Sequence, residues 1–587
     1  MAGSSRVPVS LRSFASSKKV AVKSSSFLVL NLDLFRNIVF AFFILRHFRR
    51  AVRKLRGRGV FGTLVDFYSA VRRYSYGVFL NFPGIRSKVQ SQVDEALKKL
   101  EDRLVPKGPG VTRYLALPKE GMTELQVKEE LKKYDIADSL LFSTRRFGGI
   151  QADVIFDARL SEMEHVSWEE GKVSGAVYHG GDDLLNLQSE ASRIFSISNP
   201  MHPDIFPGVR KMEAEIVAMV LAMFNAPSGA GGITTSGGTE SILMACLSAR
   251  TKAYVERGVS EPEIIVPSTA HAGFDKAGHY FGLAVHRVAV DPVTLKVDLK
   301  AVSRLVNYNT VLIAGSAPNF PHGIIDDIVG LNKIALRRRI PLHVDACLGS
   351  FLIPFLEKAG YPTEPFDFRV KGVTSVSCDT HKYGFAPKGS SVVLFRTKKL
   401  RSYGYFVSAA WPGGIYASPS LAGSRAGSLI AGTWASLMSQ GENGYTNSCR
   451  DIVGAAKEIE SGIRERLHPD LYILGEPMVS VVAFSSKTLN MYEVADELSS
   501  LGWHLNALQD PPALHIACTR PTVSAVEKFL KDLEKAVQSV KLRGEGEPGS
   551  KAAIGETTAL YGVAGSLPNK SVINAMATGF IDTLYKA

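Results

Sequence analysis

Cysteine is scarce in this sequence. Five cysteines occur among 587 residues, with no C-x-x-C pair and no histidine-rich neighbourhood at metal-ligand spacing. We therefore expect neither a disulfide framework nor a metal site. The pattern indicates reduced thiols in a cytosolic protein, buried as small hydrophobic side chains rather than used as nucleophiles. They are Cys246, Cys347, Cys378, Cys449 and Cys518.

Acidic residues are almost missing from the first 58 positions. This segment holds 13 Lys and Arg against one acid, Asp33, and so carries nearly all of the formal net charge of +13. The rest of the chain is close to neutral and has no bulk attraction for a polyanion. Nucleic acid is therefore not an expected partner.

Long uninterrupted apolar runs are also lacking. The strongest candidate, residues 27–45, has about the ~20 residues that cross a bilayer, but polar residues such as Asp33 and Arg36 interrupt it. We expect a membrane-anchoring helix here that either spans the bilayer or lies on its surface. The seven Lys and Arg within residues 46–58 predict, by the positive-inside rule, that the large domain faces the cytosol.

Apolar periodicity predicts an α/β protein. Between residues 230 and 400, short runs that are apolar on both faces alternate with helical segments, which is typical of a mostly parallel sheet covered by helices. Helical patterns also occupy residues 87–104, 122–135 and 209–224. The expected segments are a disordered N-terminus over 1–26, a membrane anchor over 27–45, a basic juxtamembrane and helical segment over 46–200, a large domain over 201–445, a small C-terminal α+β domain over 446–541 and a loosely packed tail over 542–587.

The segment SCDTHKYGFAPKG, residues 377–389, points to amine chemistry. It follows a predicted strand and places Lys382 directly after His381 in a loop rich in turn residues. A lysine in such a loop can form an imine with an aldehyde. A His-Lys pair alone is weak support, because most such pairs are solvated surface residues.

Three further features make a pyridoxal-phosphate (PLP) site the best interpretation. Asp345 ends a predicted strand, where it can hold a protonated pyridinium nitrogen or, alternatively, cap the next helix. The glycine turn over residues 236–239 leads into an apolar helix whose N-terminus can hold a phosphate. His271 can stack on the cofactor ring. The turn consists of Ser236, Gly237, Gly238 and Thr239.

These segments resemble the fold-type I PLP enzymes of the group II decarboxylase superfamily, which have an aspartate-aminotransferase-like fold, and within them the sphingosine-1-phosphate lyases. The resemblance covers about residues 110 to 540. It rests on VYHGG, SNPMHPDIFPGVRKME, TTSGGTESI, AHAGFDKA, GSAPNFPHGIIDD, HVDACLGSF, CDTHKYGFAPKGSSVVLFR and AGSRAGSLIAGTW.

The resemblance implies a retro-aldol cleavage of the Cα–Cβ bond of a phosphorylated sphingoid base, giving a long-chain aldehyde and phosphoethanolamine. It implies a cytosol-facing enzyme with a single-pass anchor in the endoplasmic reticulum membrane. Lys382 is implied to carry PLP as a Schiff base and to reprotonate the substrate. Tyr178, Asn199, His202 and Lys388 are implied to bind the substrate, with Tyr178, His202 and Lys388 also in catalysis.

The resemblance also implies a homodimer with active sites at the subunit interface. Gly423 and Ser424 resemble a loop that reaches the cofactor phosphate of a neighbouring subunit, and His381 joins the cofactor-binding set. At Phe320 the sequence lacks the hydroxyl of the tyrosine found in some bacterial relatives, which puts a proton-transfer role of that position in doubt.

Two alternatives remain open from the sequence. A PLP-dependent amino-acid decarboxylase would share Lys382, Asp345 and His271 but would need an arginine for the substrate carboxylate. A non-catalytic, membrane-tethered scaffold would keep the fold without the chemistry. Recognition of a substrate phosphate distinguishes the lyase from the decarboxylase.

Overall fold

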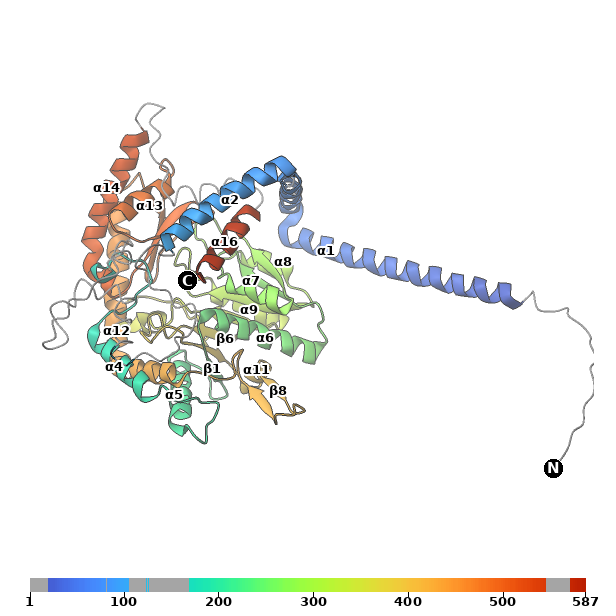
Figure 1. Ribbon diagram of the computed structural model, residues 1–587, viewed down its shortest axis with the longest axis horizontal. Coiled ribbons are helices and arrows are strands. Elements are labelled where there is room, and N and C mark those ends of the chain that lie inside the picture. Colours follow the sequence, from blue (N-terminus) through green and yellow to red (C-terminus); the bar gives the residue numbers. More distant parts are fainter. Residues whose placement is uncertain are drawn as a thin grey trace, which may run out of the picture. The chain divides into compact units, whose positions relative to one another are not determined.

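The computed structural model describes residues 20–80, 82–104, 123, 125, 168–544 and 571–586 (Figure 1). The chain divides into two compact units, residues 1–68 and 69–587. The predicted helix over residues 122–135 lies outside the described residues, apart from the isolated positions 123 and 125.

A seven-stranded mixed sheet forms the centre of the second unit, in the order β1-β7-β6-β5-β4-β2-β3. β7 is antiparallel to both of its neighbours, and every other pairing is parallel, so the predicted mostly parallel sheet is confirmed. β7 is reversed because a loop without a crossover helix joins it to β6. The strands are β1 Gly231–Thr235, β2 Glu263–Pro267, β3 Ala284–Val288, β4 Thr310–Ser316, β5 Leu342–Asp345, β6 Val373–Cys378 and β7 Ser391–Phe395.

Helices cover the sheet, as the apolar strands require. β2, β4, β5 and β7 are buried at every position, which fits strands covered on both faces. β3 differs from the expectation because it forms the edge of the sheet and is mostly not buried. The helices of this region are α6 Gly238–Arg257, α7 Gly273–Phe281, α8 Leu299–Leu305, α9 Ile328–Arg338, α10 Leu356–Ala359 and α11 Lys398–Ser402, with a 3-10 turn η2 at Ile353–Phe355.

A four-stranded antiparallel sheet, in the order β10-β11-β13-β12, forms the small C-terminal domain. Its core includes Trp503, whose indole N–H donates to Asp532 at 3.0 Å. Its elements are β10 Tyr472–Ile473, β11 Val481–Ser485, α13 Met491–Ser500, β12 Asn506–Leu508, β13 Ala513–Ala517, η3 Pro521–Ala525 and α14 Val526–Gly544.

Helix α12, Gly427–Arg466, connects the large and small domains and crosses the expected boundary at residue 446. It contacts α4 and α5 near one end and α14 near the other, and Figure 1 shows it running between these helices. The remaining elements before and beside it are η1 Trp168–Glu170, α4 Asp182–Ile194, α5 Pro207–Met223, and the small hairpin of β8 Phe406–Ser408 and β9 Tyr416–Ser418.

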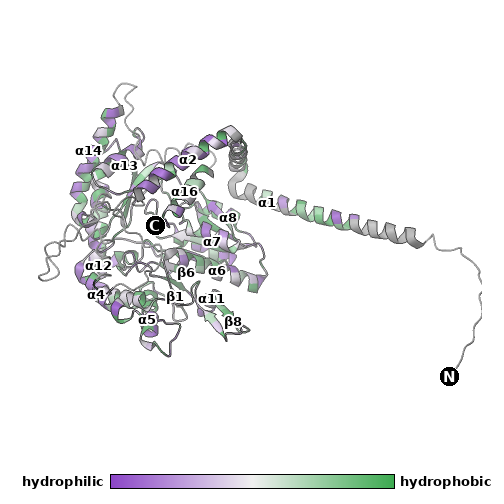
Figure 2. Ribbon diagram, in the orientation of Figure 1, coloured by the Kyte–Doolittle hydropathy of each residue, from purple (hydrophilic) through white to green (hydrophobic). Residues whose placement is uncertain are grey.

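The N-terminal helix α1 spans Val20–Leu80, so it begins inside the segment expected to be disordered. Within the described residues no helix is long and apolar enough to cross a membrane, so the spanning form of the anchor expected over 27–45 is not supported. The reason is visible in Figure 2, where hydrophilic and hydrophobic residues are interspersed along α1. Asp33 and Arg36, for example, form an exposed ion pair at 3.1 Å in the middle of that segment.

The C-terminal tail contains an element that the sequence pattern missed. Helix α16, Ser571–Thr583, packs against α2, Pro83–Leu104, although a loosely packed tail was expected. Gly579 allows the close approach, because a Cβ built there would lie 2.4 Å from a methyl carbon of Leu97. An ion pair between Lys586 and Glu101 supports the contact.

Candidate active site

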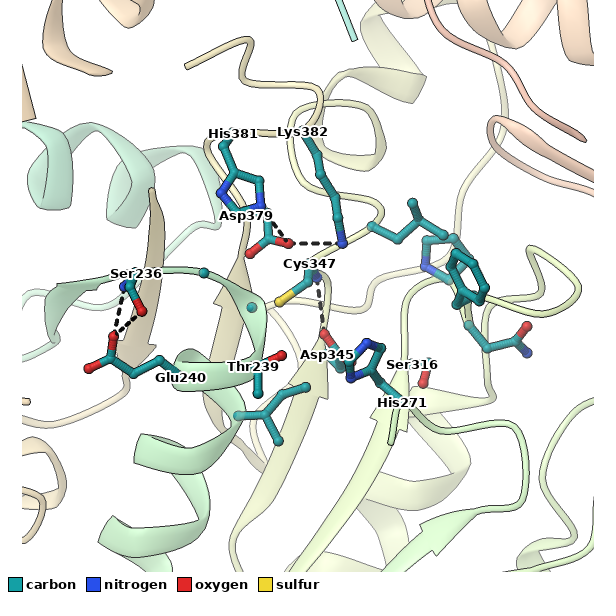
Figure 3. Close-up of a pocket in the computed structure, with 17 residues that line it drawn as sticks. Ser236, Thr239, Glu240, His271, Ser316, Asp345, Cys347, Asp379, His381 and Lys382 are labelled. Atoms are coloured by element: carbon teal, nitrogen blue, oxygen red, sulfur yellow. Dashed lines mark hydrogen bonds and ion pairs between the residues drawn. The ribbon is translucent and has the colours of Figure 1, made fainter. Parts of the chain in front are cut away.

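A cavity of about 340 Å³ lies at the carboxyl ends of the central parallel strands. It collects side chains from the loops that follow β1, β2, β4, β5 and β6, as Figure 3 shows. The residues that line it are Ser236, Gly237, Gly238, Thr239, Glu240, Ile242, His271, Ser316, Pro318, Asn319, Phe320, Asp345, Cys347, Leu348, Asp379, His381 and Lys382. Eight of the residues predicted from sequence to bind a cofactor are therefore brought together: Ser236, Gly237, Gly238, Thr239, His271, Asp345, His381 and Lys382.

Lys382 extends into this cavity from the loop between β6 and β7. Its Nζ lies 2.9 Å from Oδ2 of Asp379, and only 23% of its side chain is exposed. Burial lowers the pKa of the Lys382 amine, but the Asp379 carboxylate, with help from Cys347 and Tyr178, outweighs it and raises the pKa above its ordinary value. The structure therefore presents a charged amine to the cavity.

Asp345 ends β5 and supplies a second charge. Its Oδ1 accepts hydrogen bonds from the Cys347 backbone N–H at 3.1 Å and from the Ser377 hydroxyl at 3.0 Å. Burial raises the pKa of this carboxyl, but His271, His343 and the hydrogen bonding from Cys347 outweigh that effect and lower the pKa overall. Asp345 is thus an ionised carboxylate that can hold a cationic ring nitrogen, and the bond to Cys347 shows that it also shapes the turn after the strand.

The glycine turn forms the N-terminus of α6, with Gly237 at the cap. Both the backbone N–H and the hydroxyl of Ser236 donate to Oε2 of Glu240 at 2.7 Å. The N–H groups of Gly238, Thr239 and Glu240 are the first of the helix and have no intrahelical acceptor. A helix N-terminus with free donors favours an anion such as a phosphate.

Two histidines border the cavity, and each accepts a backbone hydrogen bond at Nδ1. Nδ1 of His271 accepts from the Gly273 N–H at 3.0 Å, and Figure 3 shows its ring beside Asp345. Nδ1 of His381 accepts from the Ser390 N–H at 3.1 Å, and its Nε2 lies 3.6 Å from Asp379. Because burial lowers the pKa of His381, its ring is neutral and carries its proton on Nε2.

Tyr178 and Lys388, predicted to bind substrate, are not among the lining residues of this cavity but lie together beside it. Nζ of Lys388 is 4.4 Å from the centre of the Tyr178 ring. Burial raises the pKa of Tyr178 to about 12. Burial, followed by the charge of Lys382, lowers the pKa of Lys388. This pair therefore combines a phenol donor with a cation near the reactive amine.

Asn199, His202, Gly423 and Ser424 form a separate cluster. The Asn199 side-chain amide donates to the Ser424 hydroxyl at 3.1 Å, and its Oδ1 accepts from the Arg425 N–H at 3.3 Å. The backbone N–H of His202 donates to the Asn199 carbonyl at 3.1 Å, while the His202 side chain is exposed. None of the four lines the cavity of its own chain.

The structure places two acidic side chains at the site that the sequence motifs did not predict, Asp379 and Glu240. Both are buried. The available signal was spacing, since Asp379 precedes Lys382 by three residues at the end of an apolar strand and a buried acid there needs a partner. Phe320 lines the cavity and packs edge-on against His515, with ring centres 4.8 Å apart.

Comparison with known families agrees with this arrangement. Residues 175–487 match the model of the pyridoxal-dependent decarboxylase conserved domain, which covers more than half of the chain. That stretch contains every residue that lines the cavity.

The sequence is also similar to curated proteins over most of its length. Sphingosine-1-phosphate lyase of Saccharomyces cerevisiae is 48% identical over 556 residues, covering 94% of this chain and 89% of the yeast protein. Sphingosine-1-phosphate lyase 1 of Mus musculus is 42% identical over 525 residues, covering 89% of this chain and 86% of the mouse protein.

Solved structures support the same assignment. The sphingosine-1-phosphate lyase of Burkholderia pseudomallei has a TM-score of 0.68 and 38% identity, covering 75% of this chain and 96% of that one. Glutamate decarboxylase of Lactobacillus brevis, with a TM-score of 0.60 and 17% identity over 74% of this chain and 96% of that one, shares the fold alone. The chain therefore belongs to the sphingosine-1-phosphate lyase family, and its cofactor is pyridoxal phosphate.

Proposed function

We propose that this protein cleaves the Cα–Cβ bond of a phosphorylated sphingoid base, sphingosine 1-phosphate or dihydrosphingosine 1-phosphate, into a long-chain aldehyde and phosphoethanolamine. One observation carries the proposal: the Lys382 amine, the ionised Asp345 carboxylate and the N-terminus of α6 converge on one cavity. The names of relatives that match over most of the chain support the substrate class.

The residues present fit PLP. The free amides of the first turn of α6 would hold its phosphate, Asp345 would hold its ring nitrogen in the protonated form, and His271 would cover the ring. When bound, PLP supplies an electron sink for the pair released as a bond to Cα breaks. Lys382 would hold the cofactor through Nζ as a Schiff base and, once released by the substrate amine, would return a proton to Cα.

The substrate phosphate needs donors other than those that hold the cofactor. We assign Lys388 and Tyr178 to this side because a cation and a phenol O–H suit a phosphate and because both lie near Lys382. The lowered pKa of Lys388 keeps its proton loosely held, which suits proton transfer as well as binding.

The second cluster supports a homodimer with shared active sites. Asn199 is hydrogen-bonded to Ser424, and the backbone of His202 is hydrogen-bonded to Asn199. Asn199 and His202 therefore lie on the same part of the surface as the 423–424 loop. Because none of these residues lines the cavity of its own chain, we assign them to the cavity of a second copy. Each active site would then combine Lys382 from one protomer with Asn199, His202, Gly423 and Ser424 from the other.

An amino-acid decarboxylase is the main competing hypothesis, since such an enzyme would use the same PLP-binding residues. It requires a group that binds the substrate carboxylate, normally an arginine. The residues that line the described cavity include no arginine. This supports the lyase, whose substrate carries a phosphate instead.

Helix α1 supports an association with the membrane surface. Phe35, Phe42 and Phe43 are among its large exposed apolar side chains, and a basic stretch follows in the sequence. We propose that this region attaches the protein to the cytosolic face of the endoplasmic reticulum, where an amphiphilic substrate is available. Fractionation and microscopy of the full-length protein test this, and a purely soluble pool would overturn it.

The decisive experiment compares the full-length protein with Lys382→Ala. We expect the wild type to show the visible absorption band of lysine-linked PLP and to release aldehyde and phosphoethanolamine from a phosphorylated long-chain base. The variant should do neither. Release of carbon dioxide from amino acids would establish the decarboxylase instead. If neither protein shows the band after addition of PLP, the non-catalytic scaffold is the remaining hypothesis.

A further inference from the structure

The proposed function gives no role to the most deeply buried acid at the site, Asp379. This residue is 1% exposed and follows the last residue of β6. Its Oδ2 pairs with Nζ of Lys382 at 2.9 Å and lies 3.6 Å from Nε2 of His381. Its Oδ1 is buried and has no hydrogen-bond partner among the described residues. A buried charge with one unsatisfied oxygen is costly and calls for a functional reason.

The position of the Asp379 carboxylate relative to α6 gives a second, independent observation. A Cβ built on Gly238 would lie 2.9 Å from both oxygens of Asp379 and 2.8 Å from Sγ of Cys347. The carboxylate therefore stands against the first turn of α6, at the positive end of the helix dipole. Figure 3 shows Asp379 facing the end of the Lys382 side chain at the edge of the cavity.

We propose that Asp379 is a positioning residue that keeps the nitrogen of Lys382 charged and fixed beside the first turn of α6, both as a free amine and when it is linked to PLP. This inference rests on the proposed linkage at Lys382 and is independent of the substrate. Linkage requires the neutral amine to attack the aldehyde carbon of PLP, after which water leaves. The paired ammonium must first lose a proton to solvent. Once freed again, the same nitrogen is held protonated where it can return a proton to the substrate.

The surroundings of Lys382 predict what removal of the Asp379 charge does. Burial opposes the charged amine, and Asp379 is the largest influence in its favour, ahead of Cys347 and Tyr178. Without the Asp379 charge, burial and the neighbouring Lys388 favour the neutral amine. The other titratable groups around the pair come from β6, the loop after it, the end of β5 and α6: Cys378, His381, Asp345 and Glu240.

The test follows the capture of PLP by the cofactor-free protein from neutral to alkaline pH, monitored by the lysine-linked absorption band. In the wild type we expect capture to speed up steeply with pH. In Asp379→Asn we expect faster capture at neutral pH, about tenfold for each pKa unit that Lys382 loses, and a band whose pH midpoint moves down. Asp379→Glu, which keeps the charge, should retain the wild-type pH dependence. Asp470→Asn removes a comparable lysine partner at the surface, where Lys541 lies 2.8 Å away, and should change nothing.

The outcomes separate the inference from the proposed function. If the band persists in Lys382→Ala, the proposed linkage fails. If the band depends on Lys382 but Asp379→Asn captures PLP with the wild-type rate and pH profile, only the role of Asp379 fails. Circular dichroism and thermal unfolding check that each variant is folded, and Asp379→Ser serves the same comparison if Asp379→Asn does not fold.

Discussion

At the N-terminus of α6, the side chain of Glu240 holds two segments together. Besides the two bonds from Ser236, its carboxylate accepts a hydrogen bond from the Leu421 N–H at 3.2 Å. It therefore joins the glycine turn to the loop that carries Gly423 and Ser424. The Glu240 carboxylate accepts the hydrogen bonds of Ser236, and the backbone amides of the first turn of α6 remain available to the cofactor phosphate.

Replacing Glu240 with alanine should weaken PLP binding. The three donors lose their acceptor and the turn loses its fixed shape, at a cost of about 1–2 kcal/mol, or about tenfold in affinity. A PLP titration monitored by absorbance measures this. Glu256→Ala, on the far turn of the same helix, is the matched control because Glu256 pairs with Lys252 at the surface. Equal PLP affinity in the two variants would contradict the role.

Buried His515 should make the protein sensitive to acid. Nδ1 of His515 donates to the Pro321 carbonyl at 2.9 Å, Nε2 has no partner within the described residues, and burial lowers the pKa to about 4. Between pH about 6.5 and about 4 the unfolded chain binds a proton that the folded protein resists, so stability falls as pH falls, by up to about 3 kcal/mol.

Denaturant unfolding at several pH values measures this effect. His515→Gln keeps a donor for the Pro321 carbonyl but does not titrate, so its free energy of unfolding should fall less between pH about 6.5 and about 4 than that of the wild type. Parallel pH curves for the two proteins would show that the His515 ring is already accessible to protons in the folded state.

At the scale of elements, the direction of β7 decides where Lys382 lies. The sequence predicted a strand on each side of the Lys382 loop, but the apolar pattern of a buried strand does not reveal its direction. Because β7 returns antiparallel beside β6, the loop between them, residues 379–390, begins and ends at the carboxyl edge of β5 and β6. That geometry brings Lys382 and Asp345 to the same cavity.

The kink in α12 is a second feature of this scale. Gly441 has φ 55° and ψ −174°, a conformation that essentially only glycine adopts, and a Cβ there would meet no atom within 4 Å. We expect Gly441→Ala to lower the free energy of unfolding by about 1–3 kcal/mol through backbone strain alone. Gly454→Ala, at a helical position of the same element, should instead be neutral or stabilising by up to about 1 kcal/mol. Chemical denaturation compares them, and equal effects would mean that α12 straightens without cost.

At the scale of the whole molecule, the contact between α2 and α16 joins the two ends of the second unit. Gly579→Leu should break this contact because the new side chain would occupy the position of Leu97. We expect faster amide hydrogen exchange in residues 83–104 and 571–583, with unchanged exchange in β4 and β5. Ala577→Leu, at an exposed position of α16, is the control and should leave exchange unaltered. Unchanged exchange in Gly579→Leu would show that the helices can repack.

Sharing of the active site between protomers can be tested by complementation. Lys382→Ala and His202→Ala should each be nearly inactive alone. Mixed dimers should recover activity, because one site then combines an intact Lys382 with an intact His202 from the other protomer. About a quarter of the wild-type activity is the expected level for random pairing with half of the protomers of each kind. No recovery, despite exchange of subunits, would mean that both residues serve the cavity of one chain.

The sequence by itself determined the local chemistry of this protein. Apolar runs indicated the strands of the sheet and the glycine turn indicated the start of α6, because these properties depend on neighbouring residues in the chain. The types and order of His271, Asp345 and Lys382 indicated the cofactor class. Tertiary structure decided what depends on distant residues: the burial of the Asp379–Lys382 pair in the cavity, the packing of α16 on α2, and the separation of Asn199 and Ser424 from the cavity. Burial and contacts between residues far apart in the sequence produce these three features, and a short stretch of sequence does not reveal either of them.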